Sequence, residues 1–331
     1  MIVLMMRYTL FLFLCAVAIM AGPKPTMAQT TDFETWLNDF RARARQEGIS
    51  QPIIDQTLYN IQPIDRVIEL DRKQPEGKWS FVQYREKIVH PLRIRRGREM
   101  MAKYADKLDA VHKRFGVAPQ YVVALWGIET NYGHNTGGFD IVPALATLAW
   151  EGRRAAFFSK ELINALRILD EGHIQPSELR GSWAGALGQN QFMPSSFHAY
   201  ATDGDGDGRK DIWNDIDDVF ASSANYLARS GWRDGERWGR EVRLPQGFSE
   251  QHVGLEVKKP LQSWKNLGVK TTAGTPIPVV DGMNASIVAP DGLGGPTYLV
   301  YNNYRVIMKW NRSTYFATSV GLIADAIASA Q

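Results

Sequence analysis

Glu129 is the residue of this sequence whose surroundings best suit acid–base chemistry. It lies at the end of an almost wholly apolar run that opens with Pro119 and stops at Asn131, and this pattern predicts a buried helix. No other acidic residue occurs between Asp109 and Asp140. Burial disfavours the charged carboxylate and the negative end of the helix dipole adds to that effect, so we expect the raised pKa that a general acid needs near neutral pH. The alternative is an ion pair between Glu129 and an arginine, with a purely structural role.

A second stretch, residues 185–197, combines small residues with side-chain amides. Its sequence is Gly-Ala-Leu-Gly-Gln-Asn-Gln-Phe-Met-Pro-Ser-Ser-Phe. The small residues allow backbones to approach closely, and the amides of Gln189 and Gln191 can bind the hydroxyl or amide groups of a sugar. Taken alone, the stretch could equally be a helix–helix contact with a loop.

Acidic residues alternate with glycines at residues 203–211, which we call the acidic loop. The alternation matches the first nine positions of an EF-hand loop: Asp203, Asp205, Asp207 and Asp211 at one, three, five and nine, Gly208 at six, and the carbonyl of Arg209 at seven. Position twelve, where an EF-hand has a bidentate glutamate, is Asn214. We predict a Ca²⁺ ion that clamps this loop structurally. The alternative is a solvated Asp-Gly turn that binds no metal.

The composition describes a folded protein and excludes several classes. Of the 331 residues, 44% are hydrophobic and 22% are charged, which provides a packed core and excludes a disordered chain. The net charge is +3 and no dense basic stripe occurs, so nucleic acid is not an expected partner. We interpret the basic run at residues 93–96 as a solvated helix face rather than a contact to an anionic polymer. No pattern in the sequence indicates an organic cofactor.

The first 28 residues have the pattern of a cleavable export signal. A basic residue precedes an apolar run at residues 8–20, and residues 26–28 fit the small-x-small cleavage pattern, so we place the cut after Ala28. The run is too short to span a bilayer comfortably, and a retained N-terminal anchor is the alternative. Leu14 stands where a lipoprotein needs a small residue before its cysteine, so we expect no acylation. Because Cys15 is the single cysteine of the sequence, the exported chain would have neither a disulfide nor a catalytic thiol.

Residues 29–331 divide by pattern into four parts. Residues 29–118 have apolar residues at helical spacing and are predicted to form a helical N-terminal subdomain, and residues 119–240 are predicted to form a helix-rich core. Residues 241–315 change to short alternating runs broken by Pro and Gly, which predicts a small β subdomain. Residues 316–331 are predicted to form an Ala-rich helix that packs on the core. The predicted fold class is therefore α+β and mainly helical, and without a repeat or a long linker we expect the parts to pack as one body.

Three motifs occur together in this chain. They are Gly-Ile-Glu-Thr-Asn-Tyr-Gly at residues 127–133, Gln-Phe-Met-Pro-Ser-Ser at residues 191–196, and the acidic loop. In this order they resemble the B-type, membrane-bound lytic murein transglycosylases, and the resemblance extends over nearly the whole of residues 29–331. It implies a lysozyme-like catalytic core with α and β subdomains. It also implies an enzyme that cleaves the β-1,4 bond between MurNAc and GlcNAc in peptidoglycan and leaves 1,6-anhydro-MurNAc ends.

The resemblance also assigns roles to single residues of this sequence. Glu129 matches the catalytic acid and base of the family. The positions that match substrate contacts, some of them near the N-acetyl group, are Arg153, Arg154, Ser182, Gln191, Tyr226 and Asn311. Asn311 stands where the family has an Arg-Tyr-Asn run, which here is Lys-Trp-Asn at residues 309–311. In the family the acid that closes the calcium loop comes later than in an EF-hand, and Asp217 matches that offset, so the expected ligands are Asp203, Asp205, Asp207, Arg209 and Asp217.

The family mechanism uses one carboxylate, whereas ordinary glycosidases use two. The acetamido group of the substrate takes the second role, and no water is consumed. Two other functions stay open at this point: a hydrolytic lysozyme-like muramidase or glucosaminidase on the same fold, and a non-catalytic peptidoglycan-binding scaffold. A binding module has no use for a buried acid, which argues against the scaffold.

Anchored members of the family are lipoproteins, and this chain lacks the acylation motif. The resemblance therefore implies a soluble protein of the periplasm. Its expected partners are peptidoglycan glycan strands, with proteins of cell-wall synthesis or remodelling as further candidates.

Overall fold

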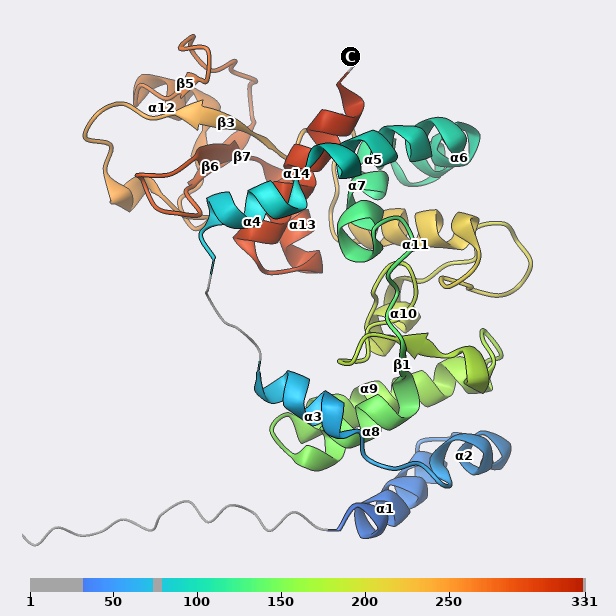
Figure 1. The fold of residues 1–331 in the computed structure, drawn as a ribbon. Helices are drawn as coiled ribbons and strands as arrows, with labels where there is room; N and C mark the ends of the chain where they lie inside the picture. Colours follow the sequence, from blue (N-terminus) through green and yellow to red (C-terminus); the bar gives the residue numbers. More distant parts are fainter. Residues whose placement is uncertain (1–31, 74–78, 330–331) are drawn as a thin grey trace, which may run out of the picture.

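The structure, a computed structural model, describes residues 32–73 and 79–329. The predicted export signal at residues 1–28 lies outside this part of the chain. The described residues are mainly helical, with one small β subdomain at one end of the molecule (Figure 1). This confirms the predicted fold class, α+β and mainly helical.

The elements follow one another in a long helical series that is interrupted by the sheet. The helices are α1 (Phe33–Gln46), α2 (Gln51–Leu58), α3 (Asp65–Arg72), α4 (Phe81–Ile88), α5 (Pro91–Lys103), α6 (Ala105–Phe115), α7 (Pro119–Thr130), α8 (Ile141–Glu151), α9 (Ala155–Asp170), α10 (Pro194–Tyr200), α11 (Ile216–Arg229), α12 (Leu261–Asn266), α13 (Asn302–Trp310) and α14 (Thr314–Ala328). The strands are β1 (Phe139–Asp140), β2 (Arg180–Gly181), β3 (Gly239–Arg243), β4 (Lys259–Pro260), β5 (Lys270–Thr271), β6 (Asn284–Val288) and β7 (Thr297–Val300), and short 3₁₀ turns occur at Pro176–Glu178 and Glu250–His252.

The first six helices belong to two different parts of the fold. α1, α2 and α3 pack against α8 and α9, whereas α4, α5 and α6 pack against α7, α11 and α14 (Figure 1). The described helices of the predicted N-terminal part, residues 29–118, thus pack on two different sets of helices. An amphipathic pattern identifies each helix but does not specify which neighbour its apolar face covers.

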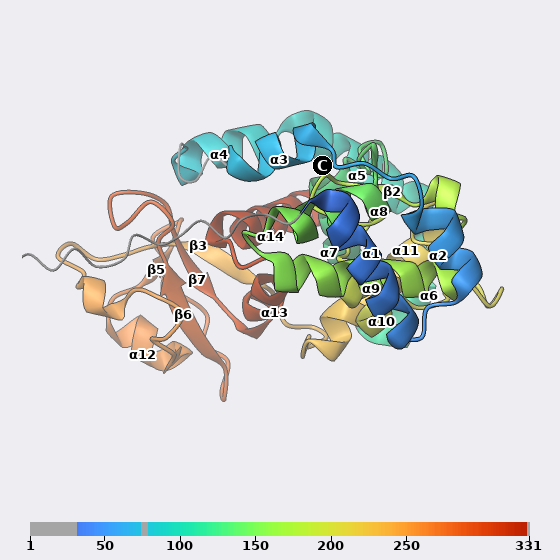
Figure 2. The same cartoon turned by 90° about the horizontal axis from the view of Figure 1, so that it is seen from below.

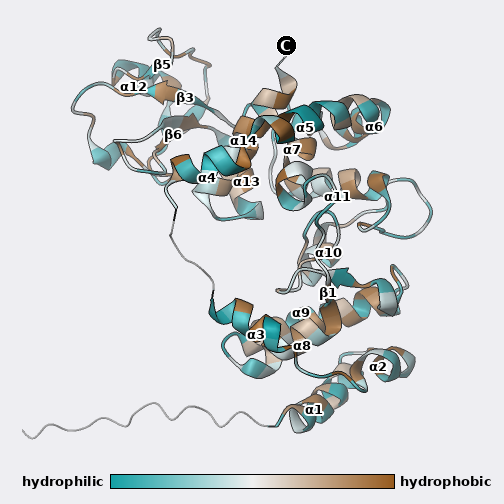
Figure 3. Cartoon of the chain, viewed as in Figure 1, coloured by the Kyte–Doolittle hydropathy of each residue, from teal (hydrophilic) through white to brown (hydrophobic). Residues whose placement is uncertain are grey.

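α7 is the central helix of the second group. α5, α6, α11 and α14 contact it, and its residues from Tyr121 to Gly127 are all buried. α14, which packs against α7, is itself apolar along most of its length (Figure 3). Ile128 and Glu129 near the C-terminal end of α7 are partly exposed, although the last residue of the helix, Thr130, is buried.

The β subdomain contains a five-stranded antiparallel sheet in the order β4-β6-β7-β3-β5. Glu241 of β3 lies opposite Tyr298 of β7, and Ile287 of β6 lies opposite Leu299. Side chains of the sheet and of α12 form a separate small core around the fully buried Trp264. A second hydrophobic core is the physical basis for calling this region a subdomain.

The last two helices join the main core. Tyr304, Val306 and Ile307 of α13 are buried there, although their sequence lies within the predicted β subdomain at residues 241–315. α14 begins at Thr314, two residues before the predicted boundary, where the Ser313 hydroxyl accepts a hydrogen bond from the backbone N–H of Phe316 and caps the helix.

A loop of the β subdomain fixes the start of α4. Asp291 accepts hydrogen bonds from the backbone N–H groups of Phe81 (2.6 Å) and Val82 (3.1 Å), and from the hydroxyl of Tyr315 on α14 (3.1 Å). A carboxylate at this place matches the positive end of the helix dipole. α4 thereby extends from the helical part toward the β subdomain (Figure 2).

Within the described residues, no helix combines the length and the apolar composition that crossing a membrane requires.

Candidate active site

Glu129 is placed by the way α7 ends. Asn131 adopts a left-handed backbone conformation (φ 51°), and its N–H bonds to the carbonyl of Gly127, which terminates the helix. The chain then turns back over the helix, so that a Cβ on Gly127 would lie 2.6 Å from the ring of Tyr132. Only glycine leaves room for this close approach. The carboxylate therefore projects from a rigid, closely packed helix end.

The Glu129 carboxyl group is embedded in protein and has one hydrogen-bond partner. Burial raises its pKa to about 7, and the hydrogen bond that it accepts from the indole Nε1–H of Trp310 at 2.8 Å acts in the opposite direction. The side chain still reaches solvent in part, so a ligand can contact it. Among the described residues no arginine or lysine forms an ion pair with Glu129, and no second carboxylate acts on its pKa. The surroundings match a general acid rather than a structural ion pair.

Tyr84 is a second titratable group near this carboxyl. It lies on α4, and its pKa is raised first by burial and then by the negative charge of Glu129. Its ring is 5.7 Å from that of Tyr315, which links it to α14. Nothing in the sequence pattern marks Tyr84, because the position is an ordinary helical aromatic 45 residues before Glu129.

An aromatic cluster lies behind Glu129. The Trp310 ring is 4.7 Å from Tyr226 and 5.2 Å from Phe192, and the Tyr226 hydroxyl donates to the carbonyl of Lys309 at 2.7 Å. Tyr226, a residue assigned by the family resemblance, therefore contacts the same Trp310 side chain that donates to Glu129. The sequence assigns no role to Trp310 itself, although its neighbour Asn311 and the Lys-Trp-Asn run that contains both are assigned to the substrate site.

Ser182 and Gln191 lie in the loops between β2 and α10. The Ser182 hydroxyl accepts a hydrogen bond from the N–H of Ala186, which closes a tight turn. Gln191 has a left-handed backbone (φ 51°), and its side-chain nitrogen donates to the carbonyls of Thr136 and Gly188. These contacts fix the plane of the Gln191 amide group.

The side-chain amide of Gln189 is hydrogen-bonded within the protein at both its oxygen and its nitrogen. Its Oε1 accepts from the indole N–H of Trp126 on α7, and its Nε2 donates to the carbonyl of Trp213, both at 2.8 Å. Asn311, which directly follows Trp310, is exposed and accepts from the N–H of Ser313. Of these two residues, Asn311 is the one with an exposed side chain next to the aromatic cluster.

Arg153 and Arg154 are brought to an acidic side chain of the N-terminal region. Both contact the carboxylate of Asp71 on α3, at 2.8 Å and 3.2 Å, and Asp71 is buried whereas both arginines are about half exposed. Each guanidinium group therefore forms an ion pair with Asp71 and remains partly accessible to solvent near the start of α9. No contact joins them to Glu129 among the described residues.

The acidic loop and the start of α11 bring three carboxylates together, and two of them belong to the five ligands expected from the sequence. Ligand oxygens of Asp203, Asp205 and Asp218 lie within 4.8 Å of one another. Asp217 forms an ion pair with Lys107 of α6, and Asp207 pairs with Arg209. The third carboxylate of this group is that of Asp218, the neighbour of the expected ligand Asp217.

The electrostatics of the loop match a cation site. Asp218 is buried and its pKa is raised to about 6 by that burial, although the N–H groups of Gly204 and Asp211 donate to its carboxylate. Asp203 is partly exposed and accepts from the N–H groups of Gly206 and Gly208, which lowers its pKa. A cation among the three carboxylates would offset both their repulsion and the burial of Asp218.

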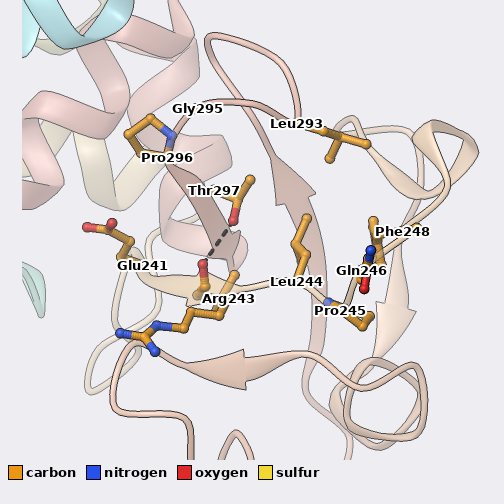
Figure 4. Close-up of a pocket in the computed structure, with 12 residues that line it drawn as sticks. Glu241, Arg243, Leu244, Pro245, Gln246, Phe248, Leu293, Gly295, Pro296 and Thr297 are labelled. Carbon is orange, nitrogen blue, oxygen red and sulfur yellow. Dashed lines mark hydrogen bonds between the residues drawn. The ribbon is translucent and has the colours of Figure 1, made fainter.

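A further cavity lies in the β subdomain, with a volume of about 610 Å³ (Figure 4). One side is lined by residues 244–248 and the other by the loop that ends at Thr297. Glu241 and Arg243 point to one side of it and Phe248 lies at the other (Figure 4). None of the residues assigned from the sequence lines this cavity, so its position gives no connection to Glu129.

Comparisons with known proteins agree with the motif resemblance. The chain matches the family model of the transglycosylase SLT domain over residues 32–325. It is 31% identical over 311 residues to the membrane-bound lytic murein transglycosylase B of Escherichia coli strain K12, a match that covers 86% of this chain and 80% of the relative.

Two solved structures show how far the likeness extends in three dimensions. SltB3 from Pseudomonas aeruginosa in complex with NAG-NAM-pentapeptide is similar with a TM-score of 0.88 and 43% identity, over 91% of this chain and 80% of that one. The Escherichia coli lytic transglycosylase Slt35 in complex with calcium is similar with a TM-score of 0.75 and 30% identity, over 88% of this chain and 92% of that one. The resemblance and the lysozyme-like fold inferred from the motifs are confirmed. The chain belongs to the transglycosylase SLT domain family.

Proposed function

We propose that this lytic transglycosylase cleaves the β-1,4 bond between MurNAc and GlcNAc in peptidoglycan without water, with Glu129 as the only protein acid and base. The observation that carries the proposal is the state of the Glu129 carboxyl: its pKa is raised to about 7, it has one neutral donor, and no second carboxylate acts on it in the described part of the chain. A two-carboxylate hydrolase would need a partner acid about 5 to 10 Å away.

In this reaction the Glu129 carboxyl group would act first as an acid and then as a base. Protonated Glu129 donates its proton to the glycosidic oxygen as the bond to C1 breaks, and the acetamido oxygen of the substrate stabilises C1. The carboxylate then accepts the proton of the C6 hydroxyl while that oxygen bonds to C1 and closes the 1,6-anhydro ring. Glu129 ends protonated, as it began, and no water enters the balance.

The remaining assigned residues would bind the sugar. Tyr226, Ser182 and Gln191 would contact the N-acetyl group and the sugar beside Glu129, since the Gln191 amide is already oriented by two backbone carbonyls. Asn311 would contact the strand from the exposed end of α13. Arg153 and Arg154 would extend the contact along the strand from their half-exposed positions at the start of α9. Such contacts contribute by orienting the substrate.

Product analysis tests the proposal. The purified chain should release muropeptides from peptidoglycan whose MurNAc ends are 1,6-anhydro, detected by mass spectrometry. Reducing MurNAc ends would instead identify a hydrolytic muramidase, and reducing GlcNAc ends a glucosaminidase. The absence of any release would support a binding scaffold.

Activity should depend on pH through Glu129. Only the protonated carboxyl can start the reaction, so kcat/KM should fall as the pH rises through about 7, the pKa of this group. Initial rates on soluble glycan strands between about pH 5 and about pH 9 measure the midpoint. A midpoint near 4.5, the ordinary value for glutamate, would contradict the assignment of Glu129 as the acid.

We also propose that the acidic loop binds Ca²⁺. The donors present match this ion, since they are carboxylate oxygens from a loop and from the start of α11. Asp203, Asp205 and Asp218 would hold the ion directly, with Asp207, Asp217 and the carbonyl of Arg209 as further ligands from the sequence pattern. The ion would tie the loop to α11 and has no part in the chemistry at Glu129. The calcium complex of Slt35 supports this proposal.

Export to the periplasm as a soluble, unacylated protein is a further part of the proposal. Intact-mass measurement of the chain expressed in a Gram-negative host should show a start near Gln29 and no lipid. Acyl mass on Cys15, or a retained Met1, would contradict this expectation. Peptidoglycan strands are the proposed partner, and proteins of cell-wall synthesis or remodelling are candidates that a pull-down with the exported form would test.

A further inference from the structure

Where the resembling family has an Arg-Tyr-Asn run, this chain has Lys-Trp-Asn at residues 309–311, and the indole of its tryptophan contacts the Glu129 carboxyl group. Trp310 is the last residue of α13, 181 positions after Glu129, and its Nε1–H donates to Glu129 Oε1 at 2.8 Å. Within residues 32–73 and 79–329, this is the one hydrogen bond to the Glu129 carboxyl. An indole N–H can donate but cannot accept, so it cannot exchange a proton with the carboxyl group.

The donor itself is held firmly from two other elements. The Trp310 ring packs against Phe192, which precedes α10, and Tyr226 of α11, and these two rings also contact each other. The Tyr226 hydroxyl donates to the carbonyl of Lys309, and the Lys309 ammonium group donates to the carbonyl of Ser230, both at 2.7 Å. The direction of the N–H bond is therefore set by packing and not by the carboxyl group alone.

In the described residues, no other group around the carboxyl takes the place of this donor. The charge of Glu129 raises the pKa of Tyr84 on α4, whereas the charge of Arg93 on α5 lowers the pKa values of Tyr84 and Tyr132. The tyrosines of this region have raised pKa values because of burial, so they stay neutral near pH 7; they are Tyr84, Tyr132, Tyr226 and Tyr315. None of them donates a hydrogen bond to the Glu129 carboxyl.

We propose that Trp310 is a positioning residue for Glu129, which fixes Oε1 as the acceptor and leaves Oε2 to carry the proton that reaches the glycosidic oxygen. The inference rests on the proposed role of Glu129 as the acid. Because the carbonyl oxygen of a neutral carboxyl is a better acceptor than its hydroxyl oxygen, the indole N–H on Oε1 favours the hydrogen on Oε2. One orientation of the acid is thereby selected before substrate binds, which is the kind of preorganisation that raises a rate.

Two variants that differ by one hydroxyl group test this role. Trp310→Phe keeps an aromatic ring but removes the donor, and it should lower kcat by about 10- to 100-fold. It should also move the fall of kcat/KM to higher pH, because the ionised carboxylate loses its one donor and its pKa rises. Trp310→Tyr restores a donor and should recover part of the rate and return the midpoint toward that of the wild-type enzyme.

A control and a direct titration separate positioning from packing. Trp213→Phe removes another indole donor, whose acceptor is the carbonyl of Arg180, and should leave the pH midpoint unchanged. The pKa of Glu129 can be measured without activity by NMR of glutamate labelled at the side-chain carboxyl carbon, with the signal assigned through Glu129→Gln. It should be higher in folded Trp310→Phe than in the wild-type protein.

Two results would overturn the inference. One is a Trp310→Phe enzyme with the wild-type kcat and midpoint. The other is a folded Trp310→Phe protein with the wild-type Glu129 pKa and a rate no lower than that of Trp310→Tyr, since the ring alone would then suffice. Failure of the proposed function is distinguishable, because it would appear in the wild-type enzyme as products without anhydro ends.

Discussion

Replacing Glu129 by Gln should lower turnover by at least ~100-fold while the fold stays intact, the usual scale for losing a positioned acid and base. The amide has nearly the same shape, and its Oε1 can still accept the Trp310 indole N–H. It has no acidic proton for the glycosidic oxygen and cannot accept one from the C6 hydroxyl. Release of anhydro-muropeptides under saturating substrate measures the loss.

The stability of the same variant gives an internal check. The folded-state pKa of Glu129 is raised to about 7, so ionisation of this group destabilises the native protein progressively as the pH rises from about 4.5 to above 7. The amide of the Glu129→Gln variant cannot ionise, so this variant should melt at or above the wild-type temperature at pH 8. Glu178→Gln, at an exposed 3₁₀ turn, is the matched control and should leave both the rate and the melting temperature near wild-type values. Near wild-type turnover by a folded Glu129→Gln protein would contradict the mechanism.

Chelation of calcium should destabilise the protein without abolishing activity at low temperature. Three carboxylates with oxygens within 4.8 Å repel one another unless a cation offsets their charge. An ion that binds only the folded state adds RT ln(1 + [L]/Kd), which is about 2.7 kcal/mol at a concentration 100 times Kd. The melting temperature should fall in EDTA and return with excess Ca²⁺. Turnover at low temperature should survive because Glu129 is not a ligand.

Single substitutions identify which acid closes the calcium site. Asp218→Asn should abolish the thermal response to Ca²⁺, because its carboxylate lies in the cluster. Asp217→Asn removes the ion pair with Lys107 and should weaken the response without abolishing it, because Asp217 lies outside the cluster. The reverse result would return the closing role to Asp217, and a wild-type melting curve that is indifferent to both EDTA and Ca²⁺ would identify the loop as a solvated turn.

The sequence determined the features that depend on neighbouring residues. An apolar stretch with Pro119 at its start and Asn131 at its end specifies a buried helix, and a single acid near the end of that helix must be desolvated. The change from helical spacing to short alternating runs near residue 240 specifies the β subdomain in the same way. Local spacing sets side-chain direction and burial in helices and strands, so these inferences need no knowledge of distant contacts.

Only the tertiary structure decided which distant residues meet. Trp310 reaches Glu129 because α13 packs into the main core, and Tyr84 does so because Asp291 fixes the start of α4. Lys107 of α6 pairs with Asp217, and the carboxylate that joins Asp203 and Asp205 is that of Asp218. These partners are chosen by the packing of amphipathic helices against one another. Many pairings satisfy the same apolar pattern, so the pattern alone cannot select among them.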